Sequence, residues 1–139
     1  MKKQKDQIYL TKSDRGKLIK MVNDFLSSSS KDKKNLLLLK EEIGRAEIID
    51  AEQIPQKIIT MNSTAKLKNI ETEEEMFIQL VYPWDADSDD YKISVLSPIG
   101  IAVLGYGAGD NVDAIVPAGL RRLKIDQILY QPETNGIYD

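Results

Sequence analysis

The chain has 139 residues, of which 42% are hydrophobic and 29% charged, and its net charge is −3. It contains no cysteine and no histidine, which excludes disulfides, thiol chemistry, a Ser-His-Asp triad and the commonest transition-metal ligands. The longest aliphatic run, Leu36 to Leu39, is far shorter than the roughly 20 residues of a membrane span. We therefore expect a globular cytoplasmic protein that does not bind membranes.

Charge is distributed unevenly along the chain. Residues 1–40 contain eleven Lys and Arg against four Asp, a net charge of +7, whereas the remaining residues have a net charge of −10. Two explanations are open: a basic segment that only accompanies an acidic body, or a basic projection directed at an acidic partner or at nucleic acid.

An amphipathic helix is predicted near the N-terminus. Thr11 or Ser13 is a suitable N-cap, and hydrophobic residues recur at helical spacing over about residues 12–28. Four serines at 27–30 then break the pattern, because their hydroxyls compete for backbone hydrogen bonds. This serine run favours a short turn.

A second helix is predicted from about residue 32 to about residue 49. Its Leu36, Leu39 and Ile43 recur at steps of three and four residues, which is typical of a coiled-coil seam. Two helices joined by a short turn form an antiparallel hairpin. We expect residues 1–50 to be an N-terminal domain of this kind, a short coiled coil.

The periodicity of hydrophobic residues falls from helical to two after a connector that contains Pro55. Pro117-Ala118-Gly119 is expected to join the last two strands as a hairpin. Strands are predicted at about residues 58–61, 65–70, 76–82, 91–96, 111–116 and 120–130. We expect residues 51–139 to form a second domain, a mostly antiparallel sheet packed against one short helix.

The short helix is predicted directly after residue 96. Ser97 is a suitable N-cap, and Pro98 occupies the first helical position, where its missing N–H costs nothing. Gly105 supplies a left-handed stop. Ile101 and Leu104 are expected to be buried against the sheet.

No arrangement of residues predicts a catalytic or metal centre. Asp85, Asp87 and Asp89 alternate as at the start of a calcium-binding loop, but Asp90 stands where that loop needs glycine and Leu96 where it needs a bidentate Glu. The glycine-rich segment after the short helix lacks the Lys-Ser/Thr of a phosphate-binding loop. We expect no cofactor.

Five motifs follow one another along the chain: Ile59-Thr60-Met61-Asn62-Ser63, Leu80-Val81-Tyr82-Pro83, Ser94-Val95-Leu96-Ser97-Pro98-Ile99-Gly100, Leu104-Gly105 with Gly109-Asp110, and Ile128-Leu129-Tyr130-Gln131-Pro132-Glu133. Together they resemble the regulator of nucleoside diphosphate kinase (Rnk) family, within the wider Gre-type transcription elongation factors. The resemblance covers about residues 40–139. It implies an FKBP-like fold for the C-terminal domain, an N-terminal coiled coil, and binding to bacterial RNA polymerase at the mouth of its secondary channel.

The tip of the predicted hairpin departs from the pattern of cleavage-active Gre factors. The resemblance implies for those factors a longer coiled coil whose tip carries an acidic pair that helps to hold a magnesium ion. Such an ion requires hard carboxylate ligands, and a lone aspartate flanked by lysines suits it poorly. The tip of this chain contains Ser29, Ser30, Lys31, Asp32 and Lys33. We therefore expect no catalytic and no metal-binding residues.

The sequence thus predicts a non-catalytic regulator that binds bacterial RNA polymerase near its secondary channel and competes with Gre-type cleavage factors, without sequence-specific contacts to nucleic acid. The alternatives are a peptidyl-prolyl isomerase, suggested only by the implied fold, and an active transcript cleavage factor. Fold alone does not confer activity. Partner-binding residues are expected at the five tip positions and, in the C-terminal domain, at Ser97, Pro98, Gly100, Gly105, Gly109, Asp110, Tyr130, Gln131 and Pro132.

Overall fold

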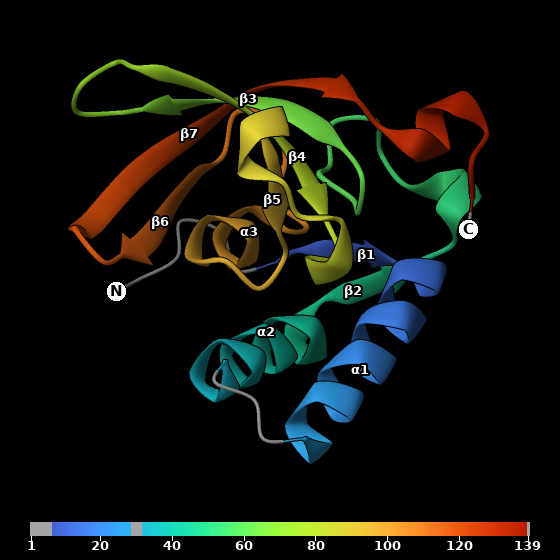
Figure 1. Ribbon diagram of the computed structural model, residues 1–139. Coiled ribbons are helices and arrows are strands. Elements are labelled where there is room, and N and C mark those ends of the chain that lie inside the picture. Colours follow the sequence, from blue (N-terminus) through green and yellow to red (C-terminus); the bar gives the residue numbers. More distant parts are fainter. Residues whose placement is uncertain (1–6, 29–31, 139) are drawn as a thin grey trace.

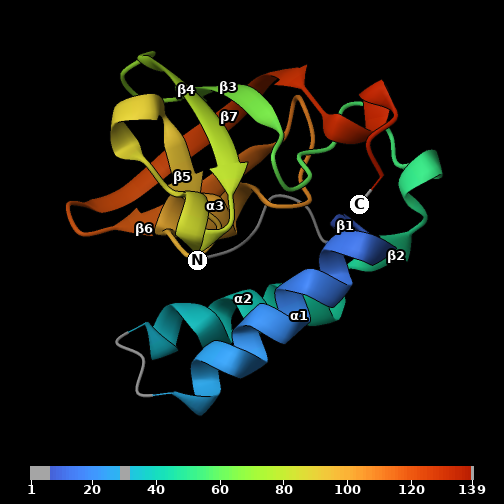
Figure 2. The same cartoon turned by 45° about the vertical axis from the view of Figure 1, so that its right-hand side comes forward.

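The computed structural model describes residues 7–28 and 32–138. Two helices lie side by side below a curled sheet, and a short third helix packs between the sheet and the second helix (Figures 1 and 2). In chain order the elements are β1 (Tyr9–Thr11), α1 (Lys12–Ser27), α2 (Lys33–Arg45), β2 (Glu47–Ile49), β3 (Thr64–Asn69), β4 (Glu75–Val81), β5 (Lys92–Ser94), α3 (Pro98–Val103), β6 (Asn111–Val116) and β7 (Gly119–Tyr130). The predicted α+β class is confirmed.

Helix α1 begins where the sequence predicts. The backbone N–H of Asp14 donates to Oγ1 of Thr11 at 3.0 Å, so Thr11 caps the helix. Helix α2 ends earlier than predicted, at Arg45 instead of about residue 49. The following residues form β2, which pairs in parallel with β1, and the N–H of Glu47 donates to the carbonyl of Ile8 at 2.8 Å. The missing helical turn is thus replaced by strand pairing with the segment before α1.

The main sheet has the strand order β5-β4-β3-β7-β6. Its pairs are antiparallel except β4 with β5, which are parallel, so the sheet is mixed and the prediction of an antiparallel sheet is wrong at this edge. The reason is that the chain leaves β4 through two 3₁₀ turns, Pro83–Asp85 and Ser88–Asp90, instead of a hairpin. The register between β3 and β7 shifts at two points, and irregularities of this kind bend strands and increase the twist of a sheet.

Two further predictions concern the chain around the sheet. The strand predicted at 58–61 is wrong, because Ile58 forms only an isolated bridge with Gly107. The turn between the last two strands is confirmed, since Val116 lies opposite Gly119 in the β6–β7 register. Gly119 has φ +124°, a left-handed conformation that side chains rarely adopt.

Helix α3 has the predicted boundaries. Oγ of Ser97 accepts from the N–H of Gly100 at 3.0 Å, and Gly105 has φ +82°. Ile101 and Leu104 are buried, as predicted. The close approach of α3 to the end of β5 depends on Gly100, because a Cβ atom there would collide with the carbonyl oxygen of Ser94.

One hydrophobic cluster extends from the N-terminal helices into the sheet. It includes Leu18 and Leu36 as well as Leu80, Tyr106 and Ile125. Polar contacts connect the same parts, since the side chain of an α2 asparagine donates to a carbonyl just before α3. The division into domains 1–50 and 51–139 stays a prediction. Across the described ranges, no helix combines the length and the hydrophobicity that crossing a bilayer requires.

Candidate docking groove

A groove of about 410 Å³ lies between α2, α3 and β6, and we call it the α2–α3 groove. Its apolar lining comes from all three elements: Leu38 of α2, Pro98 and Ile101 of α3, and Ala114 and Ile115 of β6. Ile115 is exposed and lies on the edge strand of the sheet. The groove therefore combines an apolar floor with an open rim.

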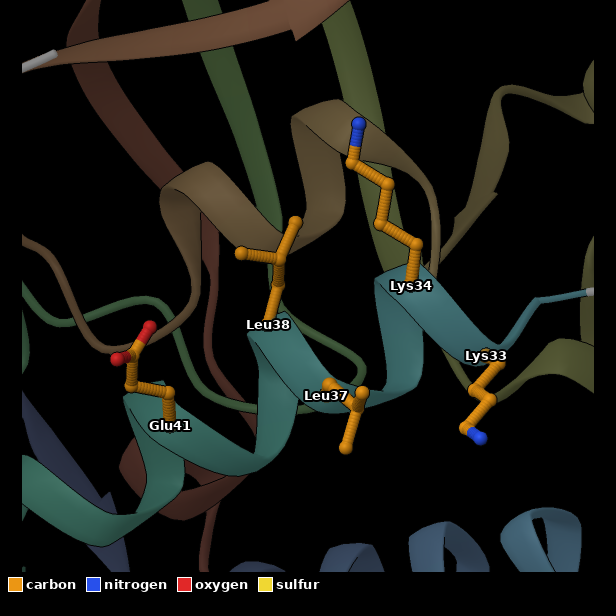
Figure 3. A pocket seen from close by; sticks show the side chains of 5 residues that line it. All are labelled: Lys33, Lys34, Leu37, Leu38 and Glu41. Atoms are coloured by element: carbon orange, nitrogen blue, oxygen red, sulfur yellow. The ribbon is translucent and has the colours of Figure 1, made fainter.

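The outer face of α2 continues this surface. Figure 3 shows Lys34, Leu38 and Glu41 on one side of the helix, with Leu37 and Lys33 pointing away from them. Lys34, Leu38 and Glu41 also line the α2–α3 groove. Leu37 is 48% exposed and Leu38 43% exposed. Exposed apolar side chains that adjoin a groove are typical of interaction surfaces.

Carboxylates give the groove an acidic wall. Glu42 already forms a two-point ion pair with Arg45, at 2.9 and 3.3 Å. Asp113 is different, because its side chain is only 5% exposed and Oδ1 lies 3.9 Å from Nε of Arg122. Its other oxygen, Oδ2, is buried without a hydrogen-bond partner in the described structure. Because Oδ2 is buried, Asp113 acts on the groove through its negative charge and not through a direct hydrogen bond to a partner.

Comparison with known proteins identifies the family. The family described as transcription elongation factor, GreA/GreB, C-terminal, matches residues 54–130. The chain belongs to this family. The regulator of nucleoside diphosphate kinase of Escherichia coli is 35% identical over 101 residues, which span 72% of this chain and 74% of that protein. The predicted resemblance to Rnk and Gre factors is thus confirmed.

Two further relatives support the same assignment. Transcription elongation factor GreA of Desulfotalea psychrophila is 37% identical over 90 residues, 65% of this chain, and the match spans little more than half of that protein, 56%. The solved structure of a prokaryotic transcription elongation factor GreA/GreB from Nitrosomonas europaea superposes with a TM-score of 0.71 and 33% identity, covering 88% of this chain and 99% of that one. These relatives support a role as a transcription factor.

Among the predicted partner-binding residues of this Gre-family domain, Pro98 lines the α2–α3 groove. Its neighbours in the motif have structural tasks: Ser97 caps α3, and Gly100 lets α3 approach β5. Gly105 has a positive φ, and a Cβ there would lie 2.9 Å from Cβ of Ile8. Their contribution to partner binding stays a prediction.

The remaining predicted residues lie in the turn after α3 and beyond β7. Gly109 has φ +93°, and Oδ2 of Asp110 accepts from the N–H of Gly107 at 2.8 Å. Gln131 is buried, and its Nε2 donates to two carbonyls, those of Pro55 at 2.9 Å and Ile58 at 2.8 Å. Pro132 is buried, whereas Tyr130 is exposed at the end of β7. Tyr130 is therefore the accessible one of the three predicted binding residues at the end of the chain, Tyr130, Gln131 and Pro132.

The predicted tip is described only in part. Ser29, Ser30 and Lys31 lie outside the described residues. Asp32 precedes α2 and Lys33 begins it, and both are exposed. The described ranges contain no cluster of three or more acidic or other ligating side chains placed to hold a metal ion.

The sequence does not predict the exposed residues Leu37, Leu38 and Ile115, or the nearly buried Asp113 of the groove. A signal existed for the two leucines, because a helix places only two of the four residues Leu36–Leu39 on one seam. Asp113 carried no such signal. Its burial depends on how β6 is packed, which spacing along the chain does not reveal.

Proposed function

We propose that the protein is a non-catalytic transcription regulator that binds bacterial RNA polymerase near the mouth of its secondary channel and competes there with Gre-type cleavage factors. Membership of the GreA/GreB family, with the Rnk regulator among the relatives, is the observation that carries this proposal. The FKBP-like architecture of residues 51–139 and the antiparallel coiled coil of residues 1–50 belong to the same proposal. The isomerase alternative rests on fold alone, which does not confer activity.

The α2–α3 groove is the docking surface in this proposal. Leu38 and Ile115 offer apolar area at its rim, and hydrophobic burial stabilises a complex by roughly 25 cal/mol per Å². The negative charges of Glu41 and Asp113 in the lining favour a Lys or Arg side chain from the partner. A polymerase segment that combines an apolar side chain with a basic one fits this lining.

The tip supports a non-catalytic role. A single acid, Asp32, stands there among Lys31, Lys33 and Lys34. The nearest acid along α1, Asp24, is paired with an α1 lysine at 2.8 Å. A divalent ion prefers several hard oxygen ligands, and positive neighbours oppose its approach. The tip is therefore poorly suited to supply magnesium ligands to a polymerase active site.

Binding is tested with the full-length protein and purified polymerase core. Leu38→Asp places a charge on the apolar rim, and we expect the dissociation constant to rise at least about tenfold. Phe77→Asp is the matched control, because Phe77 is an equally exposed hydrophobic residue on β4, outside the groove, and should leave affinity unchanged. Absence of binding by the wild-type protein would remove the proposal.

The absence of catalysis is tested on a backtracked elongation complex with magnesium. The full-length protein alone should leave the transcript at its original length, and it should slow cleavage when added together with a GreA factor. Leu38→Asp should lose this inhibition if the groove is responsible for docking. A transcript shortened by the wild-type protein alone would establish the cleavage-factor alternative.

A further inference from the structure

A second cleft lies on the other side of the helical pair, between α1 and the turn Pro83–Asp85. Its volume is about 440 Å³, and we call it the Trp84 cleft. It is lined by Lys17, Lys20, Met21, Asp24, Phe25, Tyr82 and Trp84. The size falls in the range of small-molecule sites, roughly 300–1,000 Å³. Neither the family assignment nor the proposed docking at the groove uses these side chains.

Trp84 forms an open aromatic platform in this cleft. Its ring stacks on Tyr82 with a centroid separation of 5.2 Å and an interplanar angle of 2°. Trp84 is 65% exposed although Tyr82 covers one face of the indole, so the opposite face is accessible. The turn is held by the N–H of Asp85, which donates to the carbonyl of Tyr82 at 2.9 Å. Stacking on Tyr82 and the hydrogen bond of the turn therefore hold the indole ring in place.

Two lysines stand beside the platform. Lys17 and Lys20 are three residues apart on α1, which places them on the same face of the helix. Lys20 pairs with Asp24 at 2.8 Å, but both side chains are well exposed, and such pairs contribute little. Lys17 forms no salt bridge within the described structure, although the charge of buried Asp14 acts on it. Two lysines against the single carboxylate of Asp24 leave the lining of the cleft with a net positive charge.

We propose that the Trp84 cleft binds a nucleobase that carries a phosphate group. The base stacks on the open face of Trp84, and the phosphate lies between the ammonium groups of Lys17 and Lys20. Base–aromatic stacking tolerates every base, so little base preference is expected. A proline-rich peptide would stack on the Trp84 ring but would offer no negative charge to the two lysines. An acidic peptide would pair with the lysines but would leave the face of the ring uncovered.

Two kinds of ligand present a nucleobase with a phosphate group: a free nucleotide and the end of a single-stranded RNA. Trp84 is the only tryptophan in the chain, so intrinsic fluorescence reports directly on the cleft. The full-length protein alone is titrated at low salt with AMP, adenosine, ribose 5-phosphate and a short oligoadenylate. AMP should quench Trp84 saturably, adenosine should bind about tenfold more weakly because it lacks the phosphate contacts, and ribose 5-phosphate should not quench. Tighter binding of the oligoadenylate than of AMP would identify the end of a single-stranded RNA as the ligand. Equal binding would identify the free nucleotide as the ligand.

Charge reversal tests the lysines. Lys17→Glu and Lys20→Glu should each weaken AMP binding about tenfold, whereas Lys124→Glu, an exposed lysine on β7 outside the cleft, should not. Unchanged quenching in Lys17→Glu would overturn the proposal, as would a lack of quenching by AMP and oligoadenylate. Quenching by a proline-rich peptide alone would also overturn it and assign the cleft to a protein segment. No polymerase is present, so the result is independent of the docking proposal.

Discussion

The segment around α3 and the outer face of α2 lie next to each other but use their residues in opposite ways. Around α3, the motif residues that mark the family are used inside the molecule: Ser97 as a cap, Gly100 at a close approach and Gly105 in a left-handed turn. On α2, Leu37 and Leu38 are exposed and belong to no family motif. Apart from Pro98, which lines the groove, the motif residues around α3 are thus distinct from the residues exposed on α2.

The difference has a physical cause. A cap or a left-handed turn accepts very few residue types, so such positions give a sequence its recognisable motifs. An apolar rim accepts any large hydrophobic side chain, because its interactions are non-directional. An apolar surface on α2 therefore leaves only a weak pattern in the sequence, namely the two leucines that a single seam does not use.

The largest expected effect is in the α3 segment. Leu104 is 1% exposed, and Leu104→Ala should lower the free energy of unfolding by about 2–5 kcal/mol, since it removes buried methyl groups and leaves a cavity. Urea denaturation of the full-length protein followed by circular dichroism measures this change. An unchanged urea midpoint would contradict the contrast between the buried α3 segment and the exposed face of α2, because Leu104 would then behave as a surface residue.

A smaller, pH-dependent effect is expected at Asp14, a buried acid of α1 that is 4% exposed. Burial raises the pKa of its carboxyl from 3.8 to about 6, although the N–H of Met61 donates to it and opposes the shift, and the charge of Glu133 adds to it. Between pH 4 and pH 6 the folded state therefore binds more protons than the unfolded state. The contribution of Asp14 to stability rises as the pH falls through 6.

Asp14→Asn removes this titration while keeping an oxygen that can accept from Met61. The difference in unfolding free energy between wild type and variant should shift by about 2 kcal/mol in favour of the wild type from pH 7 to pH 4. Urea titrations of both proteins at several pH values measure it. A difference that stays constant with pH would show that Asp14 is not a titrating buried acid.

Local signals explain which elements could be predicted. Helix α1 and helix α3 each carry a cap and helical spacing, which act within a few residues. The sequence does not predict β1 and β2, because each has only three residues and is stabilised by pairing with a strand distant along the chain. The N–H of Glu47, for example, donates to the carbonyl of Ile8. The parallel β4–β5 pair was missed because it depends on the path of the loop, where Tyr91 has φ +59°.

The candidate sites were less predictable than the fold. The α2–α3 groove is lined by segments around residues 34–42, 98–102 and 113–115, which only the fold brings together. Pro98 was singled out for its place in a motif and lies in the groove. Trp84 lies outside the predicted strands, and nothing in its neighbours along the chain predicts that Lys17 and Lys20 lie beside it.

The smallest effect is expected at Leu37, which can be compared with its neighbour Leu36 in the same helix. Leu36 and Leu37 are neighbours on α2, but Leu36 is fully buried and Leu37 is 48% exposed. Leu37→Ala should change the free energy of unfolding by less than about 0.5 kcal/mol, as is usual for surface substitutions, and alanine favours the helix slightly. Leu36→Ala is the matched control, with the same chemical change and a loss of about 2–5 kcal/mol. Equal losses in the two variants, measured by urea denaturation, would mean that Leu37 is covered by another part of the protein and that the outer face of α2 is not open to a partner.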